Sequence, residues 1–372
     1  MASKRDHPAT IVSGTAHFAR KLLMSEYFAL ILSVVYFLVI ACIVPSMFSV
    51  RNMQNIFSNM WPLFTVAIGQ TFVLLLGGID LSQSSIMSLT SVMGTIFICR
   101  SANPDTLGTS PLWGWFLTEN GGPFANAPDL VATLIGIAIM LIVGILIGFI
   151  NGNLIARLDM PPFMVTLISK MFFSALAILI TKSRNVMFLP KSFEDLGYEA
   201  ISFIPYSFFI AVLLGIVAHF ILTYTVRGRH IYSTGVNKKA SQVSGISTIK
   251  TQIFVYSFSG FCAALASVLY SARMMQGRPT LGDAMFNDIM AATVIGGTSM
   301  YGGKGKVTWT LFGVLFYTSL STSLQQLKLD NFTIDIVKGG VILLAATLDA
   351  VRSQMQRNLI IPVEKNSRKE VA

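Results

Sequence analysis

Charged residues are scarce in this chain of 372 residues. Asp, Glu, Lys and Arg make up only 12% of it, whereas an ordinary soluble domain carries about 25%. Hydrophobic residues make up 53%, and the mean hydropathy is +0.67. So few charges cannot cover the surface of a water-soluble body of this size. The composition excludes a large soluble domain and is typical of a polytopic membrane protein built from α-helices.

Cysteine is also rare, and the chain has no patch of basic residues that would suit nucleic acid. Cys42, Cys99 and Cys262 all fall in apolar stretches, without the spacing or the His partners of a metal site. The net charge is +10, but no long basic run carries it, so we predict no nucleic acid partner. The sequence indicates no catalytic residues, no metal site and no structural disulfide.

A complete phosphate-binding loop is missing as well. The segment GGKGK ends near Gly305. It lacks the spacing of G-x-x-x-x-G-K-[ST], and a glycine stands where a Mg²⁺-binding Ser or Thr is needed. We therefore predict that the chain is not an enzyme and has no cofactor of its own. Any ATP and Mg²⁺ would be bound by a partner subunit.

Ten apolar stretches are what the sequence does contain. Nine suit the ~20 residues of a spanning helix, and the one at 289–301 is shorter. The predicted fold is all-α and polytopic, with about ten transmembrane helices, one of them short or broken. The stretches lie at 27–47, 60–78, 81–99, 130–150, 162–181, 205–224, 252–272, 289–301, 307–327 and 332–351.

The distribution of Lys and Arg predicts the orientation. With a cytoplasmic N-terminus and ten crossings, 17 of the 27 Lys and Arg residues lie inside and 8 outside, as the positive-inside tendency favours. A re-entrant loop at 289–301 would instead put the basic end of the chain outside. We predict a cytoplasmic segment at 1–26, a transmembrane domain at 27–351 and a cytoplasmic charged tail at 352–372. Within the domain, 101–128 is an external loop and 227–250 an internal loop.

Two glycine-rich segments interrupt the apolar stretches: GGIDLS from Gly77 and GGTSMYGGKGK from Gly296. Breaks in a membrane helix are tolerated where the freed backbone groups face protein, water or a substrate path. They make Gly77, Gly78, Gly296 and Gly297 candidates for a translocation path. Asp80 has two readings, as a carboxylate that caps the next helix or as a pathway residue, and the two are compatible.

Two further patterns concern packing and docking. Gly144, Gly148 and Gly152 recur every four residues, which predicts a helix face that another helix approaches closely. The internal loop reads GVNKKASQVSGI from Gly235 to Ile246. It predicts a short polar helix between glycines, which either docks into a partner's groove or is a solvated loop.

The chain resembles the permease subunit of ribose-type (monosaccharide) bacterial ABC importers. Five segments carry the resemblance, and they occur in the family's order over most of residues 50–352. They are GGIDLS, NGNLIARLDMPPFMVTL, GVNKKASQVSGI, IGGTSMYGGKG and IVKGGVILLAATLDAVR, which begin at Gly77, Asn151, Gly235, Ile295 and Ile336.

The resemblance implies that the internal loop couples the permease to its ATPase, through Asn237, Lys239, Ala240, Ser241 and Gly245. Here Lys239 replaces the acid of the family's Glu-Ala-Ala-x-x-x-Gly pattern, and Ser241 replaces its second Ala. The resemblance also places the hinge between Asn151 and Phe163 near the translocation path; from the residues alone it could equally be a plain loop before a helix.

The implied function is ATP-driven import of a small polyhydroxylated solute, a monosaccharide, by alternating access. The implied partners are an ATP-binding cassette ATPase, an extracytoplasmic sugar-binding protein, membrane lipid and a second permease copy, identical or a close paralogue. The implied location is the bacterial plasma (inner) membrane, with both termini cytoplasmic. Two alternatives stay open: a secondary transporter driven by an ion gradient, which needs a buried acidic relay, and a membrane scaffold.

Overall fold

The computed structural model describes residues 27–347 and 350, apart from 202–203 and 284. The predicted segments 1–26 and 352–372 lie outside the described residues. The first half of the chain forms α2 (Phe28–Ile43), the 3₁₀-helix η1 (Pro45–Phe48), α3 (Val50–Leu75), α4 (Ser82–Ile98), α5 (Pro104–Leu107), α6 (Asp129–Arg157) and α7 (Pro162–Thr181).

The second half begins with α8 (Lys191–Tyr198) and a two-stranded antiparallel hairpin, β1 (Ala200–Ile201) and β2 (Ile204–Pro205). The hairpin is followed by α9 (Tyr206–Tyr224), α10 (Val226–Val236), α11 (Lys238–Val243), α12 (Thr248–Met274), α13 (Met285–Gly296) and α14 (Val307–Gln326). After α14, a further helix covers 331–347.

Each of the ten predicted stretches overlaps one of these helices, which confirms the all-α polytopic fold. The helix predicted at 60–78 differs most, because α3 begins at Val50. Its first turns hold polar residues such as Arg51 and Asn55, which hide the helix from a search for apolar residues. A side-chain cap marks the start of α3, because the Asn52 N–H donates to the Ser49 Oγ at 3.3 Å.

By length and composition, four of the described helices can cross a membrane: α6, α7, α9 and α12. Two shorter helices, α2 and α13, are apolar as well. Since α13 has 12 residues, the predicted short helix near 289–301 is confirmed, although it begins and ends earlier than expected.

The core is formed by the second half of α3 together with α4 and α12. In α4 all but Met93 and Phe97 are buried, although much of this helix is Ser, Thr and Gln. Hydroxyl groups join it to α12: Ser91 and Ser271 Oγ atoms are 2.6 Å apart, and Ser267 donates to the Met87 carbonyl at 2.8 Å. Hydrogen bonds between helices therefore compensate the polar side chains that α4 brings into the core.

The predicted glycine ridge on α6 packs directly on α12. A Cβ added at Gly144 would lie 2.6 Å from the Gly260 carbonyl oxygen, and one at Gly148 would lie 2.3 Å from that of Tyr256. Such distances are shorter than any real Cβ contact, so only glycine permits this approach. The prediction of close helix packing is confirmed.

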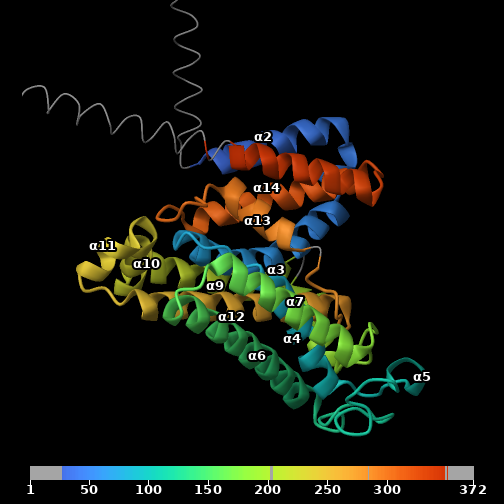
Figure 1. The fold of residues 1–372 in the computed structure, drawn as a ribbon. Helices are drawn as coiled ribbons and strands as arrows, with labels where there is room; N and C mark the ends of the chain where they lie inside the picture. Colours follow the sequence, from blue (N-terminus) through green and yellow to red (C-terminus); the bar gives the residue numbers. More distant parts are fainter. Residues whose placement is uncertain (1–26, 202–203, 284, 348–349, 351–372) are drawn as a thin grey trace, which may run out of the picture.

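The two predicted loops lie at opposite ends of the molecule. Figure 1 shows α10 and α11 at one end, and the loop that contains α5 at the other. This arrangement agrees with one loop inside and one outside.

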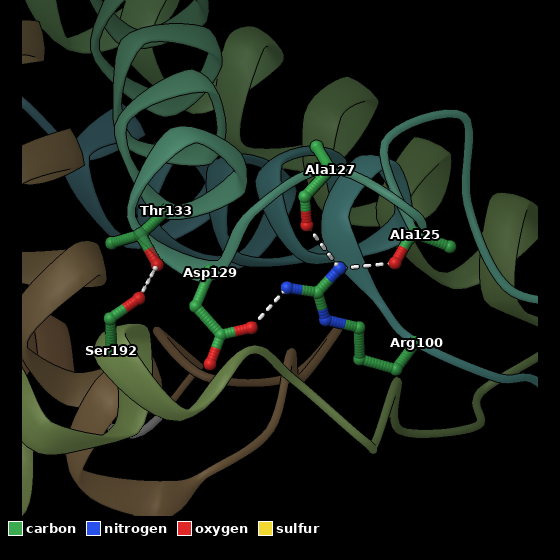
Figure 2. A network of polar contacts seen from close by, with 6 residues as sticks. All are labelled: Arg100, Ala125, Ala127, Asp129, Thr133 and Ser192. Atoms are coloured by element: carbon green, nitrogen blue, oxygen red, sulfur yellow. Dashed lines mark hydrogen bonds and ion pairs between the residues drawn. The ribbon is translucent and has the colours of Figure 1, made fainter.

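An arginine closes the loop at 101–128 (Figure 2). Arg100, at its start, donates through Nη1 to the carbonyls of Ala125 and Ala127, and through Nη2 it forms an ion pair with Asp129, at its end. Nearby, the hydroxyls of Thr133 and Ser192 are 2.7 Å apart and join α6 to α8. The loop is thus a folded element with both ends fastened together.

Candidate translocation and coupling site

The two glycine breaks end their helices with the same hydrogen bonds. At the end of α3, Gly77 N–H donates to Leu74 O at 2.8 Å and Gly78 N–H to Val73 O at 3.1 Å. At the end of α13, the N–H groups of residues 297 and 298 donate to the carbonyls of 294 and 293, at 2.9 and 3.2 Å. Gly77 has φ +77° and Gly297 has φ +106°, the left-handed conformation that this helix end requires. Both glycine breaks are therefore capped helix ends.

Asp80 follows the first break and is only 1% exposed. Its Oδ1 accepts from the Ser82 N–H at 3.0 Å and from the Ser82 hydroxyl at 2.5 Å. Its Oδ2 accepts from the Ser259 hydroxyl of α12 at 2.6 Å. The carboxylate does meet the first turn of α4, as the capping interpretation predicts.

Asp80 is the centre of a buried polar network that joins α4, α6, α7 and α12. Asn151 of α6 donates through Nδ2 to the Ser82 hydroxyl at 2.9 Å, and it accepts a hydrogen bond from Ser169 of α7. Gln83 donates to the Ser259 hydroxyl at 2.8 Å. Two of the predicted path residues, Asp80 and Asn151, thus lie one serine apart. We call these residues the Asp80 network.

The two breaks also touch each other. The Gly303 N–H donates to the Leu75 carbonyl at 2.8 Å, which joins the loop after α13 to the last turn of α3. A Cβ at Gly302 would lie 3.0 Å from the Gly77 nitrogen, and Gly302 and Gly303 have φ of +86° and +70°. Glycine is needed here for both the close approach and the backbone conformation.

The internal loop reaches the same point through α10. Gly235, in the last turn of α10, lies so close to α3 that an added Cβ would be 1.8 Å from the Leu75 carbonyl oxygen. The Tyr232 hydroxyl donates to the Gly305 carbonyl at 2.7 Å. We call the contact of Leu75, Gly77, Gly235, Gly302 and Gly303 the glycine junction. It brings both breaks and the internal loop into contact.

The predicted polar helix of the internal loop is α11. The Asn237 Oδ1 caps it by accepting from the Ala240 N–H at 3.0 Å. Ser241 is buried, and its hydroxyl lies 2.8 Å from that of Ser233. Lys239, Ala240 and Gly245 are exposed, and Gly245 has φ +81°. The serine that replaces the family's alanine therefore faces α10, while its neighbours face outward.

An ion pair ties α11 to the turn between α6 and α7. Lys238 Nζ lies 2.6 Å from Asp159 Oδ1. The hydrogen bond and charge of Lys238 hold the pKa of Asp159 below its ordinary value. Both side chains are exposed, so this contact contributes little to stability.

The other predicted path residues lie elsewhere. A Cβ at Gly296 would be 2.5 Å from the Trp309 carbonyl oxygen, so this glycine lets α13 pack on α14. Phe163 is 53% exposed, in the first turn of α7. Neither residue is among those of the Asp80 network.

An Asp–Lys pair joins helices at the other side of the core. Lys338 Nζ lies 3.4 Å from Asp288 Oδ1 of α13, and the Tyr317 hydroxyl of α14 donates to the same carboxylate. The pair fastens the helix over 331–347 to the α13–α14 hairpin.

Comparison with known proteins identifies the family. A family model described as the permease component of a branched-chain amino acid transport system matches residues 52–346. The ribose import permease protein of Haemophilus influenzae is 30% identical over 90% of this chain and 96% of its own. The chain belongs to this permease family.

Two other relatives of the permease carry different sugar names. The L-arabinose ABC transporter permease protein of Azospirillum brasilense is 26% identical over 88% of both chains. The D-allose transport system permease protein of Escherichia coli is 26% identical over 82% of this chain and 85% of its own. No solved structure matches the permease.

The family membership confirms several predictions. The permease is a multi-pass membrane protein, a transport subunit of an ABC importer and not itself an enzyme. Importers of this kind work with a separate ATPase subunit and a binding protein.

Sequence reasoning missed part of the site. Gly235 begins one motif and Gly302 and Gly303 lie inside another, yet only the structure brings them together. Ser82 was seen only as the end of GGIDLS, and Ser169 and Ser259 gave no signal, because a serine in an apolar stretch does not indicate its hydrogen-bond partner.

Proposed function

We propose that the permease carries a small polyhydroxylated solute of the monosaccharide class inward, driven by ATP that a partner ATPase binds with Mg²⁺ and hydrolyses. The support for the solute class is that the relatives are named for three different sugars. Two copies of the permease, identical or closely related, would form the pathway between them. An extracytoplasmic binding protein would deliver the solute.

The observation that carries the mechanism is the glycine junction. The exposed face of α11, with Lys239 and Ala240, would dock on the ATPase. Movement of α11 would pass along α10 to Gly235, which contacts the end of α3. Since Gly302 and Gly303 share that contact, the end of α13 would move with it. One displacement of the loop would therefore shift both capped helix ends, as alternating access requires.

The Asp80 network supplies a polar centre next to these helix ends. It joins four helices through serine, asparagine and carboxylate groups. We assign Asp80, Asn151, Gly77 and Gly78 to the inner part of the path, where breaking and remaking these bonds would let α4, α6 and α7 separate. Gly296, Gly297 and Phe163 would act at its edge, on α13 and α7.

The two ends of the molecule support the orientation that we propose. The basic internal loop with α10 and α11 would face the cytoplasm together with both chain termini. The clasped loop at 101–128 would face outward, where Trp115 is 86% exposed.

A matched pair of glycine substitutions tests the coupling assignment. Gly245 and Gly114 have φ of +81° and +83°, and a Cβ at either would meet nothing within 4 Å. Gly245→Trp and Gly114→Trp therefore impose similar backbone strain, but only the first would block docking of the ATPase. In proteoliposomes with the ATPase, Gly245→Trp should abolish ATP-driven uptake, while Gly114→Trp should retain it. Uptake by Gly245→Trp at the wild-type rate would contradict the assignment.

The same preparation separates the ion-driven alternative. An ABC importer carries solute toward the side of its ATPase, so it should take up solute when ATP is inside the vesicle, even in the presence of an uncoupler. Loss of uptake on adding the uncoupler alone, with ATP present, would favour a secondary transporter.

A further inference from the structure

An apolar groove runs along the outside of the bundle between α3, α9 and α14. It encloses about 430 Å³, and most of the residues that line it are aromatic or aliphatic. Phe208 and His219 on α9 mark its two ends, about three helical turns or roughly 16 Å apart. That length and the apolar lining suit one extended hydrocarbon chain. The lining includes Trp61, Phe64, Phe208, Val212, Ile216 and Leu311.

The groove continues into a second cavity of about 580 Å³, because His219 and Thr308 line both. This cavity is different in character. It holds two cationic side chains, Arg229 of α10 and Lys306 before α14, and three aromatic residues with polar groups, Tyr27, Tyr232 and Trp309.

Among the described residues, the charged side chains that line the second cavity are cationic. Of the described residues that line the two cavities, none is acidic. Arg229 is exposed and forms no ion pair with any described residue. Lys306 Nζ lies 5.2 Å from the centre of the Trp309 ring. The cavity is thus suited to an anion held between two cations and aromatic rings.

The position of the second cavity along the bundle indicates which anion it would bind. Arg229 belongs to α10 and lines the same cavity as Lys306. The cavity therefore lies at the end of the molecule that carries α10 and α11 (Figure 1), which the permease would turn to the cytoplasm. Tyr and Trp side chains concentrate at the level of lipid headgroups. The inner leaflet carries anionic lipids, which basic pockets between helices bind at that level.

We propose that the groove and the cavity together bind one anionic phospholipid of the inner leaflet. Its phosphate lies against Arg229 and Lys306, and one acyl chain occupies the groove beside α9. The site is separate from the solute path and does not depend on which solute is carried. It adjoins the glycine junction, because Tyr232 lines the cavity and donates to the Gly305 carbonyl at 2.7 Å.

The headgroup half of the site is tested by binding of phosphatidylglycerol and phosphatidylcholine with the same acyl chains to the full-length permease, counted by native mass spectrometry. Phosphatidylglycerol should bind more tightly. The double variant Arg229→Gln, Lys306→Gln should weaken its binding about tenfold. The control Arg227→Gln, Lys250→Gln removes two cations that line a separate cavity at the same end, and it should leave the affinity nearly unchanged.

The part of the site that would hold the acyl chain is tested by a matched pair of substitutions on α9. Ile216 is 62% exposed and lines the groove, whereas Leu213 is 64% exposed and does not. Ile216→Trp should fill the groove and lower phosphatidylglycerol binding, and Leu213→Trp should not. Equal affinity for the two lipids, or a loss no greater in the Arg229 and Lys306 variant than in its control, would overturn the proposal.

Discussion

The two glycine breaks have the same local geometry and different surroundings. Each ends a helix with a glycine at positive φ and the same pair of backbone hydrogen bonds. After the first, the chain enters α4, which is buried and held by the Asp80 network. After the second, it runs through Gly302 and Gly303 and returns as α14, which packs against α13. The two helix ends therefore have the same structure, and they differ in the residues that follow them and in what those residues contact.

The largest effect is expected from a substitution in the glycine junction, the contact that the two glycine breaks share. In Gly235→Ala the new Cβ would lie 1.8 Å from the Leu75 carbonyl, a backbone atom that cannot turn away. We expect ATP-driven uptake to fall at least tenfold and stability to fall by about 3 kcal/mol.

The matched control is Gly339→Ala, where a Cβ would meet nothing within 4 Å. It should keep wild-type uptake in proteoliposomes and an unchanged midpoint of thermal unfolding. If Gly235→Ala behaved like this control, the glycine junction would not link the loop to the helices.

A smaller loss of stability should distinguish the first glycine break from the second. Asp80→Ala removes the acceptor of three hydrogen bonds, so the Ser82 N–H and the Ser82 and Ser259 hydroxyl protons lose their acceptor in the core. We expect a loss of about 2 kcal/mol, measured by thermal or denaturant unfolding in detergent.

Thr298→Ala is the corresponding change after the second break. The Thr298 hydroxyl is buried and has no hydrogen-bond partner among the described residues, so its removal should leave stability within about 1 kcal/mol of the wild type. Equal losses in the two variants would mean that the Asp80 network does not distinguish the breaks.

The smallest effect should come from the tether between α11 and the α6–α7 turn. Because folding lowers the pKa of Asp159, the ion pair with Lys238 is present above the ordinary carboxyl pKa and is lost only as the pH falls through the lowered value. Uptake should therefore not change through this pair between about pH 6 and pH 8. Lys238→Met should leave the unfolding midpoint unchanged and reduce uptake slightly. A steep change in uptake with pH that disappears in Lys238→Met would contradict this view.

Apolar stretches were enough to predict where the helices lie, because lipid-facing helices such as α6 and α7 must be apolar along most of their length. They failed at the start of α3, where Ser49 and the polar residues after it form a helix that hydropathy does not detect. The sequence did predict that Asp80 hydrogen-bonds to the first turn of α4, because this contact joins residues that are close neighbours in the chain.

Contacts between distant parts of the chain could not be predicted. The approach of Gly235 to Leu75 and the pairing of Asp288 with Lys338 depend on how the helices pack. Asp288 and Lys338 are 50 positions apart in the sequence, and nothing in the residues around either one indicates the other as its partner. The same holds for Ser259 and Asp80, which lie on helices far apart in sequence.

The burial of α4 has a consequence for how the chain enters the membrane. A helix with Gln83, Ser84, Ser85, Ser88 and Ser91 on it gains little from lipid as a solvent. Its partners on α6, α7 and α12 are synthesised later, and α12 supplies the hydroxyls of Ser259 and Ser271. Stable integration of an early helix must therefore wait for a late one, so the membrane domain is completed as a unit and not one crossing at a time.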